Sequence, residues 1–186
     1  ETAEYYQNII SSLFNCNTNL RFRENKNYYE LRIQGKPISK FIKKEFPEIK
    51  NNRTSMIPDK VLKSPDYIVA SFLKGIYDAE GFCSGGKVCL AMNDEFFIRQ
   101  IQMTLLRFGI ISSISKKIIN NVPYWRLTVT GRYAELYAKE IGFIVNHKKE
   151  RIEQYHLIGA IQGCGDQDMI ALGNSLKELR QRLGFT

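Results

Sequence analysis

Apolar and polar residues alternate along this chain with the spacing of helices and strands, in the repeated order helix, strand, strand, helix. Apolar positions three and four residues apart predict helices, and apolar positions two residues apart predict strands. Helices are predicted over residues 1–14, 37–46, 95–108, 133–143 and 147–154, and between Pro65 and Glu80. Strands are predicted over residues 19–23, 28–34, 110–117 and 124–130, and a hairpin over residues 82–93. The pattern predicts an α+β fold with antiparallel sheets.

The chain also repeats itself. Residues 28–35 read YYELRIQG and residues 124–131 read YWRLTVTG, and each stretch is preceded by a helix and a strand and followed by a helix. An internal repeat constrains the architecture, because each copy is one structural unit. Residue 1 aligns with residue 95, so the helix and hairpin of residues 64–94 have no counterpart before Glu1. We expect an incomplete first copy and a complete second copy.

Residues 73–81 read LKGIYDAEG and end the helix that follows Pro65. Gly75 and Ala79 lie four residues apart on one face, where a second helix can approach closely. Glu80 lies in the last turn, and we expect Gly81 to end the helix in the left-handed conformation. A carboxylate at this end faces the negative pole of the helix, so a nearby cation is expected.

This stretch resembles the motif that names the LAGLIDADG homing endonucleases, and the repeat resembles that family's αββαββα half-domain. The resemblance implies one N-terminally incomplete LAGLIDADG repeat over residues 1–63, a complete repeat over 64–150 and a helical extension over 151–186. In the family, antiparallel sheets form a DNA-binding saddle, and two motif helices pack together at its centre. The resemblance therefore implies two partners: double-stranded DNA, and a second LAGLIDADG helix from a missing N-terminal segment or another chain.

The chemistry implied by the resemblance is Mg²⁺-assisted hydrolysis of phosphodiester bonds. The resemblance implies that Glu80 is the catalytic and metal-binding carboxylate and that the Gly81 carbonyl is a second metal ligand. The family also places a basic residue nine positions before the glycine that ends the second strand. Lys26 fits this catalytic role in the first copy, but the second copy has Val122. The helix–helix interface is assigned to Gly75 and Ala79.

The charge distribution favours a polyanionic partner. The net charge is +8, and residues 19–60 hold eleven Lys and Arg against five Asp and Glu. Phosphate contacts by such residues supply much of the affinity for DNA. The period of two also separates the faces of each strand, so the outward side chains can read base edges. The predicted DNA-binding residues are Arg21, Arg23, Glu30, Arg32, Gln34, Lys87, Ser115, Lys117, Tyr124, Arg126 and Thr128.

Other features limit the alternatives. The four cysteines show no CxxC pairing and there are two histidines, which argues against a zinc site. No apolar run approaches the roughly 18 residues needed to cross a bilayer. We expect reduced thiols in an intracellular protein, cytoplasmic or organellar. Ser175 and Glu178 form a capping-box pattern before a leucine stripe, which is typical either of the start of a helix-turn-helix or of an ordinary terminal helix.

Two functions therefore compete. The first is a site-specific DNA endonuclease, either free-standing or embedded in an intein. The alternative is a non-cleaving nucleic-acid-binding module with the same fold, such as a transcription regulator or an intron maturase. The acidic or neutral character of the residue equivalent to Glu80 in the other motif would distinguish them.

Overall fold

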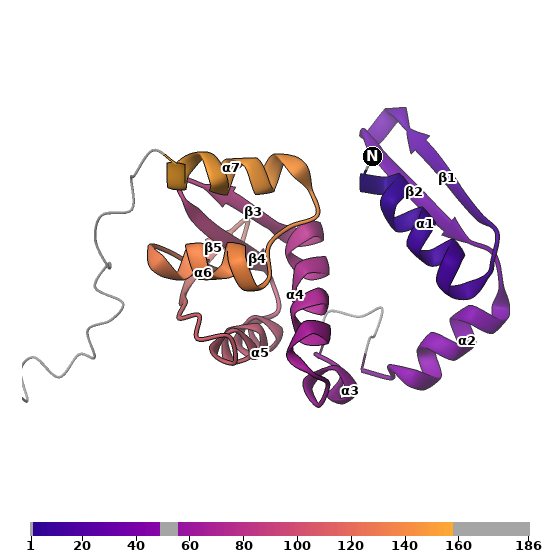
Figure 1. Ribbon diagram of the computed structural model, residues 1–186, viewed down its shortest axis with the longest axis horizontal. Helices are drawn as coiled ribbons and strands as arrows, with labels where there is room; N and C mark the ends of the chain where they lie inside the picture. The colour runs from indigo at the N-terminus through magenta and orange to yellow at the C-terminus, as the bar shows by residue number, and fades with distance from the viewer. Residues whose placement is uncertain (1, 49–55, 158–186) are drawn as a thin grey trace, which may run out of the picture. The chain divides into compact units, whose positions relative to one another are not determined.

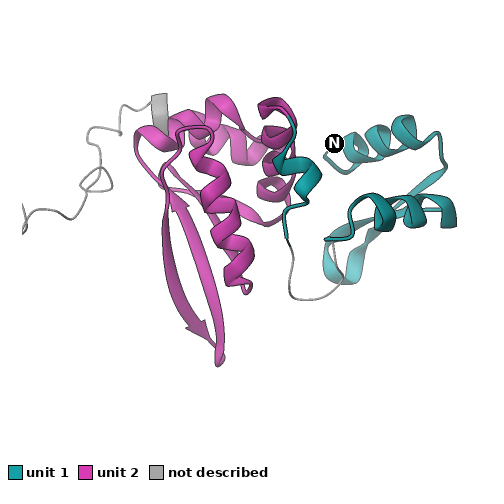
Figure 2. Ribbon diagram, turned by 90° about the horizontal axis from the view of Figure 1, so that it is seen from below, with its two compact units in different colours: residues 1–64 teal, residues 65–186 magenta. Residues whose placement is uncertain are grey.

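The computed structural model describes residues 2–48 and 56–157, in two compact units (Figure 2). Unit 1 covers residues 1–64 and unit 2 covers residues 65–186. Within the described residues, no helix combines the length and the apolar content that a membrane crossing requires. The helix predicted after Ser175 lies outside the described residues.

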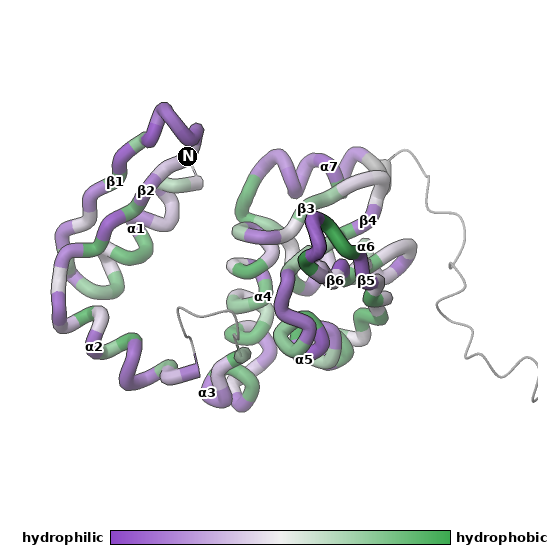
Figure 3. Tube along the Cα trace, turned by 180° about the vertical axis from the view of Figure 1, so that it is seen from behind, coloured by the Kyte–Doolittle hydropathy of each residue, from purple (hydrophilic) through white to green (hydrophobic). Residues whose placement is uncertain are grey.

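Unit 1 is a two-stranded antiparallel sheet with helices (Figure 1). Its elements are α1 (Thr2–Phe14), β1 (Thr18–Arg23), the 3-10 turn η1 (Glu24–Lys26), β2 (Tyr28–Ile33), α2 (Lys36–Glu45) and α3 (Asp59–Leu62). Hydrophilic and hydrophobic residues alternate along both strands (Figure 3). Phe22 pairs with Tyr29, so the two rings share one face of the sheet, with centroids 4.9 Å apart.

Apolar residues at every second position of a strand are expected to face a core, but this face is not buried within unit 1. Phe22 is 44% exposed and Tyr29 is 61% exposed. None of the residues described between 2 and 48 is buried. Helix α1 packs against both strands but leaves these rings in solvent. The apolar face of unit 1 is therefore available to another element.

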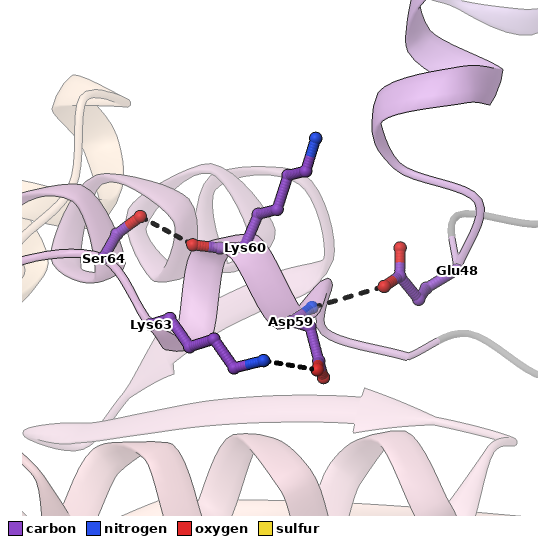
Figure 4. Close-up of polar contacts among 5 residues, drawn as sticks. All are labelled: Glu48, Asp59, Lys60, Lys63 and Ser64. Carbon is purple, nitrogen blue, oxygen red and sulfur yellow. Dashed lines mark hydrogen bonds and ion pairs between the residues drawn. The ribbon is translucent and has the colours of Figure 1, made fainter.

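Polar contacts hold α3 near the end of α2. The Asp59 N–H donates to Glu48 at 3.4 Å, and Lys63 forms an ion pair with the Asp59 carboxylate at 3.0 Å (Figure 4). Ser64 donates to the Lys60 carbonyl at 2.7 Å, and Lys60 also pairs with Glu45. Of these contacts, the Asp59–Glu48 hydrogen bond and the Lys60–Glu45 ion pair join the segments on either side of residues 49–55.

Unit 2 has the αββαββα order predicted for the complete repeat, followed by one more helix (Figure 1). Its elements are α4 (Asp66–Glu80), β3 (Gly81–Ser84), β4 (Lys87–Met92), α5 (Glu95–Leu106), β5 (Ser113–Ile119), β6 (Val122–Val129), α6 (Arg132–Glu140) and α7 (Asn146–Leu157). The antiparallel sheet has the strand order β3-β4-β6-β5. The predicted α+β fold is confirmed, and each sheet keeps an open face, as a saddle requires.

The helices of unit 2 cover one face of its sheet and form the core. Leu73 and Tyr77 from α4 are fully buried, as are Ile98 from α5, Leu90 from β4 and Leu127 from β6. Burying apolar side chains of this size stabilises a fold by about 1.5–3 kcal/mol each. The core thus fixes α4 against the sheet.

Strand β5 begins three residues later than predicted. Gly109 takes a left-handed conformation (φ +68°), and the Ile110 N–H donates back to the Leu105 carbonyl at 3.1 Å. This turn ends α5 and places Ile110 in the core at 0% exposure. Ile110 therefore serves as a helix-terminating core residue, and the strand starts at Ser113.

Candidate functional site

Glu80 is the last residue of α4 and its side chain is exposed. Gly81 follows with φ −84° and ψ 163°, and its N–H donates to the Tyr77 carbonyl. The predicted left-handed conformation is wrong, since this backbone is extended. Glycine is required for another reason: a Cβ at residue 81 would lie 2.5 Å from the backbone carbonyl oxygen of Tyr77 and 2.9 Å from the Tyr77 ring. The tight junction lets β3 start directly beside Glu80.

One face of α4 is lined by small or exposed residues. Tyr67, Ser71, Gly75 and Ala79 recur every four residues, so they follow one side of the helix. Tyr67 is 70% exposed, whereas Ala79 adds a small side chain near the end that carries Glu80. A Cβ at Gly75 would meet no atom within 4 Å. Packing inside unit 2 therefore does not explain glycine at position 75.

The buried Lys148 side chain contacts the backbone at the end of α4. The Lys148 ammonium donates to the Asp78 carbonyl at 2.6 Å and to the Tyr77 carbonyl at 3.1 Å, and this side chain is 9% exposed. Burial lowers the pKa of Lys148, while Asp78, Cys83 and Glu80 oppose that shift. Lys148 is the cation expected at this helix end. The sequence pattern did not identify it, because it follows α4 by almost seventy residues.

The open face of the unit 2 sheet carries the predicted DNA-binding residues of this unit. In the strand register, Ser115 lies opposite Arg126 and Lys117 opposite Tyr124. Thr128 pairs with Cys89 on the neighbouring strand, and by parity Lys87 points to the same side. The structure therefore brings these six predicted side chains to one face. Cys89, which parity places on the same face, is buried.

Phe82 belongs to this face and was not predicted. The Arg126 guanidinium lies 5.4 Å from the centroid of the Phe82 ring, in a cation–π arrangement. Phe82 is the second residue of β3, two positions after Glu80. The ring therefore holds Arg126 beside the strand that begins at the end of α4. An aromatic residue directly after the motif was the available signal in the sequence.

In unit 1, basic residues gather at the β1–β2 hairpin. A hollow of about 460 Å³ is lined by Arg21, Phe22, Arg23, Glu24, Asn25, Lys26 and Tyr28. Lys26 lies in η1, where the chain turns between the strands. Gln34 follows the end of β2 and is exposed. The structure thus groups Lys26 with Arg21 and Arg23, within a unit separate from that of Glu80.

Glu30 holds two of the predicted arginines. Its carboxylate pairs with Arg23 at 2.7 Å and with Arg32 at 3.1 Å. Hydrogen bonds from Arg23, then from Arg32, lower the pKa of Glu30. Since a free carboxylate would repel phosphate, its pairing with two guanidinium groups makes Glu30 a support for them on this face.

Comparisons with known proteins agree with this geometry. Residues 68–142 match the family model of the LAGLIDADG-like domain. The chain is 31% identical, over 99% of its length and 17% of the relative's, to a glutamine–fructose-6-phosphate aminotransferase of Methanocaldococcus jannaschii. It is 30% identical, over 76% of the chain and 12% of the relative, to a probable translation initiation factor IF-2 of Thermococcus kodakarensis. A DNA polymerase of Thermococcus litoralis is 26% identical over 69% of the chain and 8% of its own length.

The chain therefore spans 17% or less of the length of these curated relatives. Among solved structures, the homing endonuclease I-DmoI has the same fold. The complex of I-DmoI with DNA and Mn has a TM-score of 0.57 at 15% identity, covering 75% of this chain and 71% of that one. The complex with DNA and Ca has a TM-score of 0.59 at 13% identity, covering 79% and 72%.

Proposed function

Because the chain belongs to the LAGLIDADG family, we propose that it is the DNA-cleaving region of a site-specific homing endonuclease. The observation that carries this proposal is the position of Glu80. Its exposed carboxylate ends α4 where β3 begins, and the same sheet presents Arg126, Tyr124 and Lys117 on its open face. A duplex on that face would place a phosphodiester bond near the helix end, and similar folds are known in complex with DNA.

The residues at the end of α4 fit a hard divalent cation, for which we propose Mg²⁺. The Glu80 carboxylate and the Gly81 carbonyl are oxygen donors, which Mg²⁺ prefers. When bound, the ion supplies an activated water and neutralises developing charge. Among the described residues, no three His, Cys, Asp or Glu side chains gather as a metal site. Glu80 therefore needs ligands from DNA, water and a second carboxylate.

We propose that a second motif helix brings that carboxylate. The small-residue face of α4 is exposed, and glycine at position 75 leaves room that nothing in unit 2 fills. A LAGLIDADG helix from an N-terminal segment or from another chain would fill the room beside Gly75.

We further propose that the region is embedded in an intein. Its relatives are an aminotransferase, an initiation factor and a DNA polymerase, which share no activity, yet the similar segment covers only a small part of each. A segment common to unrelated proteins is expected of a mobile insertion. A free-standing enzyme remains the other form of the proposal. Either form would act where its DNA is, in the cytoplasm or in an organelle.

A non-cleaving DNA-binding module is the second candidate. Val122, which starts β6, stands where Lys26 stands in the first copy, so the complete repeat lacks that basic residue. Its exposed side chain cannot donate a proton or bind phosphate. Such a module would bind DNA in the same way but leave both strands intact.

Cleavage of selected DNA tests the proposal. Duplexes bound by a chain that also carries a second LAGLIDADG helix are selected from a random pool and then incubated with Mg²⁺ or EDTA. Cleavage should require Mg²⁺ and should vanish in Glu80→Gln, while DNA affinity stays close to that of the wild type. Glu140→Gln, at the exposed end of α6, is the matched control and should cleave normally. Binding without cleavage under all conditions would favour the non-cleaving module, and no binding would refute both.

A further inference from the structure

Lys148 makes contacts that the proposed function does not use. The end of a helix leaves carbonyl groups without intrahelical partners and carries partial negative charge. The Asp78 carbonyl in the last turn of α4 receives its hydrogen bond from Lys148 at 2.6 Å. The Tyr77 carbonyl accepts from both Lys148 and the Gly81 N–H. The ammonium of Lys148, a residue that is 9% exposed, thus caps two carbonyl groups at the end of α4.

The Asp78 side chain in turn binds the backbone just before α7. Its carboxylate accepts hydrogen bonds from the N–H of Ile144, 3.1 Å from both oxygens, and from the N–H of Val145 at 3.2 Å. These residues directly precede α7, where a negative charge is favourable. The side chain of Asp78 thus holds the start of α7, and Lys148 of α7 holds the backbone of Asp78.

The Glu80 carboxylate has no comparable support of its own. Within the described part of the chain, no hydrogen bond or ion pair involves its side chain. Its place is therefore determined by the backbone of the last turn of α4, which Lys148 and Asp78 fix from behind. A displacement of about 1 Å at a reacting group can cost about 100-fold in rate.

We propose that Lys148 is a positioning residue for Glu80, acting with Asp78 as a clamp between the end of α4 and the start of α7. The inference rests on the proposed function, since Glu80 must be placed against a phosphodiester. The clamp touches no substrate and works through the backbone of residues 77 and 78. It adds α7, which follows the αββαββα repeat, to the elements that cleavage requires.

The test uses the full chain and three variants. Lys148→Met removes the ammonium while keeping a long side chain. Lys149→Met makes the same change one residue later, at a side chain that is exposed and pairs with Glu153 on the surface, so it is the matched control. Asp78→Asn weakens the clamp from the other side and decides the question if Lys148→Met does not fold.

The first readout does not depend on activity. Amide hydrogen exchange of Gly81, measured by NMR, should speed up at least about tenfold in Lys148→Met and in Asp78→Asn, but not in Lys149→Met. Ile98 in the core of α5 should stay protected in all three, which separates local opening from global unfolding. Unchanged exchange at Gly81 in a folded Lys148→Met, or in Asp78→Asn, would overturn the clamp.

The second readout separates positioning from simple structural support. In a chain that also carries a second LAGLIDADG helix, the single-turnover cleavage rate of Lys148→Met should fall about 100-fold while its DNA dissociation constant changes less than about twofold. Faster exchange at Gly81 with an unchanged cleavage rate would overturn the positioning role. If the wild type does not cleave DNA at all, the proposed function fails, whereas the Gly81 exchange still decides whether the clamp exists.

Discussion

At the scale of single residues, Tyr77 carries a polar group that the core does not satisfy. Its side chain is fully buried, and its hydroxyl finds no hydrogen-bond partner among the described residues. Burying such a group without a partner costs about 1–3 kcal/mol. Tyr77→Phe should therefore raise the free energy of unfolding by about 1 kcal/mol, measured by urea denaturation.

Tyr137→Phe is the matched control for this change. The Tyr137 ring lies 4.9 Å from that of Tyr77, but its hydroxyl donates to the Gly142 carbonyl at 3.4 Å. Removing this hydroxyl should lower stability, by up to about 1 kcal/mol. Equal effects of the two substitutions would show that Tyr77 has a partner after all.

Cys83 predicts a dependence of stability on pH. Burial raises the pKa of the Cys83 thiol from 9.0 to about 11, although Lys148 and Arg151 oppose this shift. Below pH 9 the thiol is neutral in both states, so its contribution is fully present. As the pH rises from 9 to 11, the unfolded thiol ionises first and stability is lost. Urea denaturation should show a smaller loss over this range in Cys83→Ala than in the wild type, with Cys16→Ala as control.

Some residues of the site could be predicted from the sequence and others could not. Glu80 and Gly81 could be proposed from the sequence because the motif is contiguous, yet the reason for glycine is a steric contact with Tyr77 that only the fold reveals. Lys148 was missed because its partner carbonyls belong to a helix distant in sequence. Backbone acceptors leave no pattern of residue types.

At the scale of elements, Gly75 within α4 and Gly81 at the start of β3 should respond in opposite ways to alanine. A Cβ at Gly75 meets nothing, so Gly75→Ala should stabilise isolated unit 2 by about 0.5–1 kcal/mol through lower backbone entropy in the unfolded chain. A Cβ at Gly81 meets the Tyr77 carbonyl, so Gly81→Ala should destabilise by about 1–3 kcal/mol. Thermal unfolding of the two variants tests both values.

Gly75→Ala also tests the partner helix. If a second motif helix packs on this face, the added methyl should weaken that association even as it stabilises unit 2. Sedimentation of the assembled protein measures the association. A stabilising substitution that leaves association unchanged would place the helix contact elsewhere.

The elements themselves follow from local pattern to different degrees. The αββαββα order could be predicted because the periodicity and the internal repeat both indicate it, and the structure confirms it. The predicted start of β5 was wrong because the apolar side chain of Ile110 packs in the core and does not belong to the strand. The strand faces followed from parity, whereas the exposure of Phe22 depends on what covers unit 1, which parity does not determine.

At the scale of the whole molecule, the open sheet faces should bind DNA in a salt-dependent way. Arg126→Ala should cost about 1–3 kcal/mol of binding free energy on a selected duplex and less on random DNA, because Arg126 would read a base edge. Arg99→Ala, on α5 and paired with Glu95, is the control and should bind normally. Affinities measured over a range of salt concentrations separate the cases: equal losses on both DNAs would make Arg126 a phosphate contact.

The contribution of a second motif helix is most directly tested by comparing two lengths of the protein. Cleavage of a selected duplex with Mg²⁺ is measured for the 186-residue chain and for a longer chain that also contains a second LAGLIDADG helix, with sedimentation of both. The longer chain should cleave at least about 100-fold faster, since the proposed site needs a second carboxylate, and Glu80→Gln should abolish its activity. A monomeric 186-residue chain that cleaves as fast as the longer one would refute a shared catalytic centre at the end of α4.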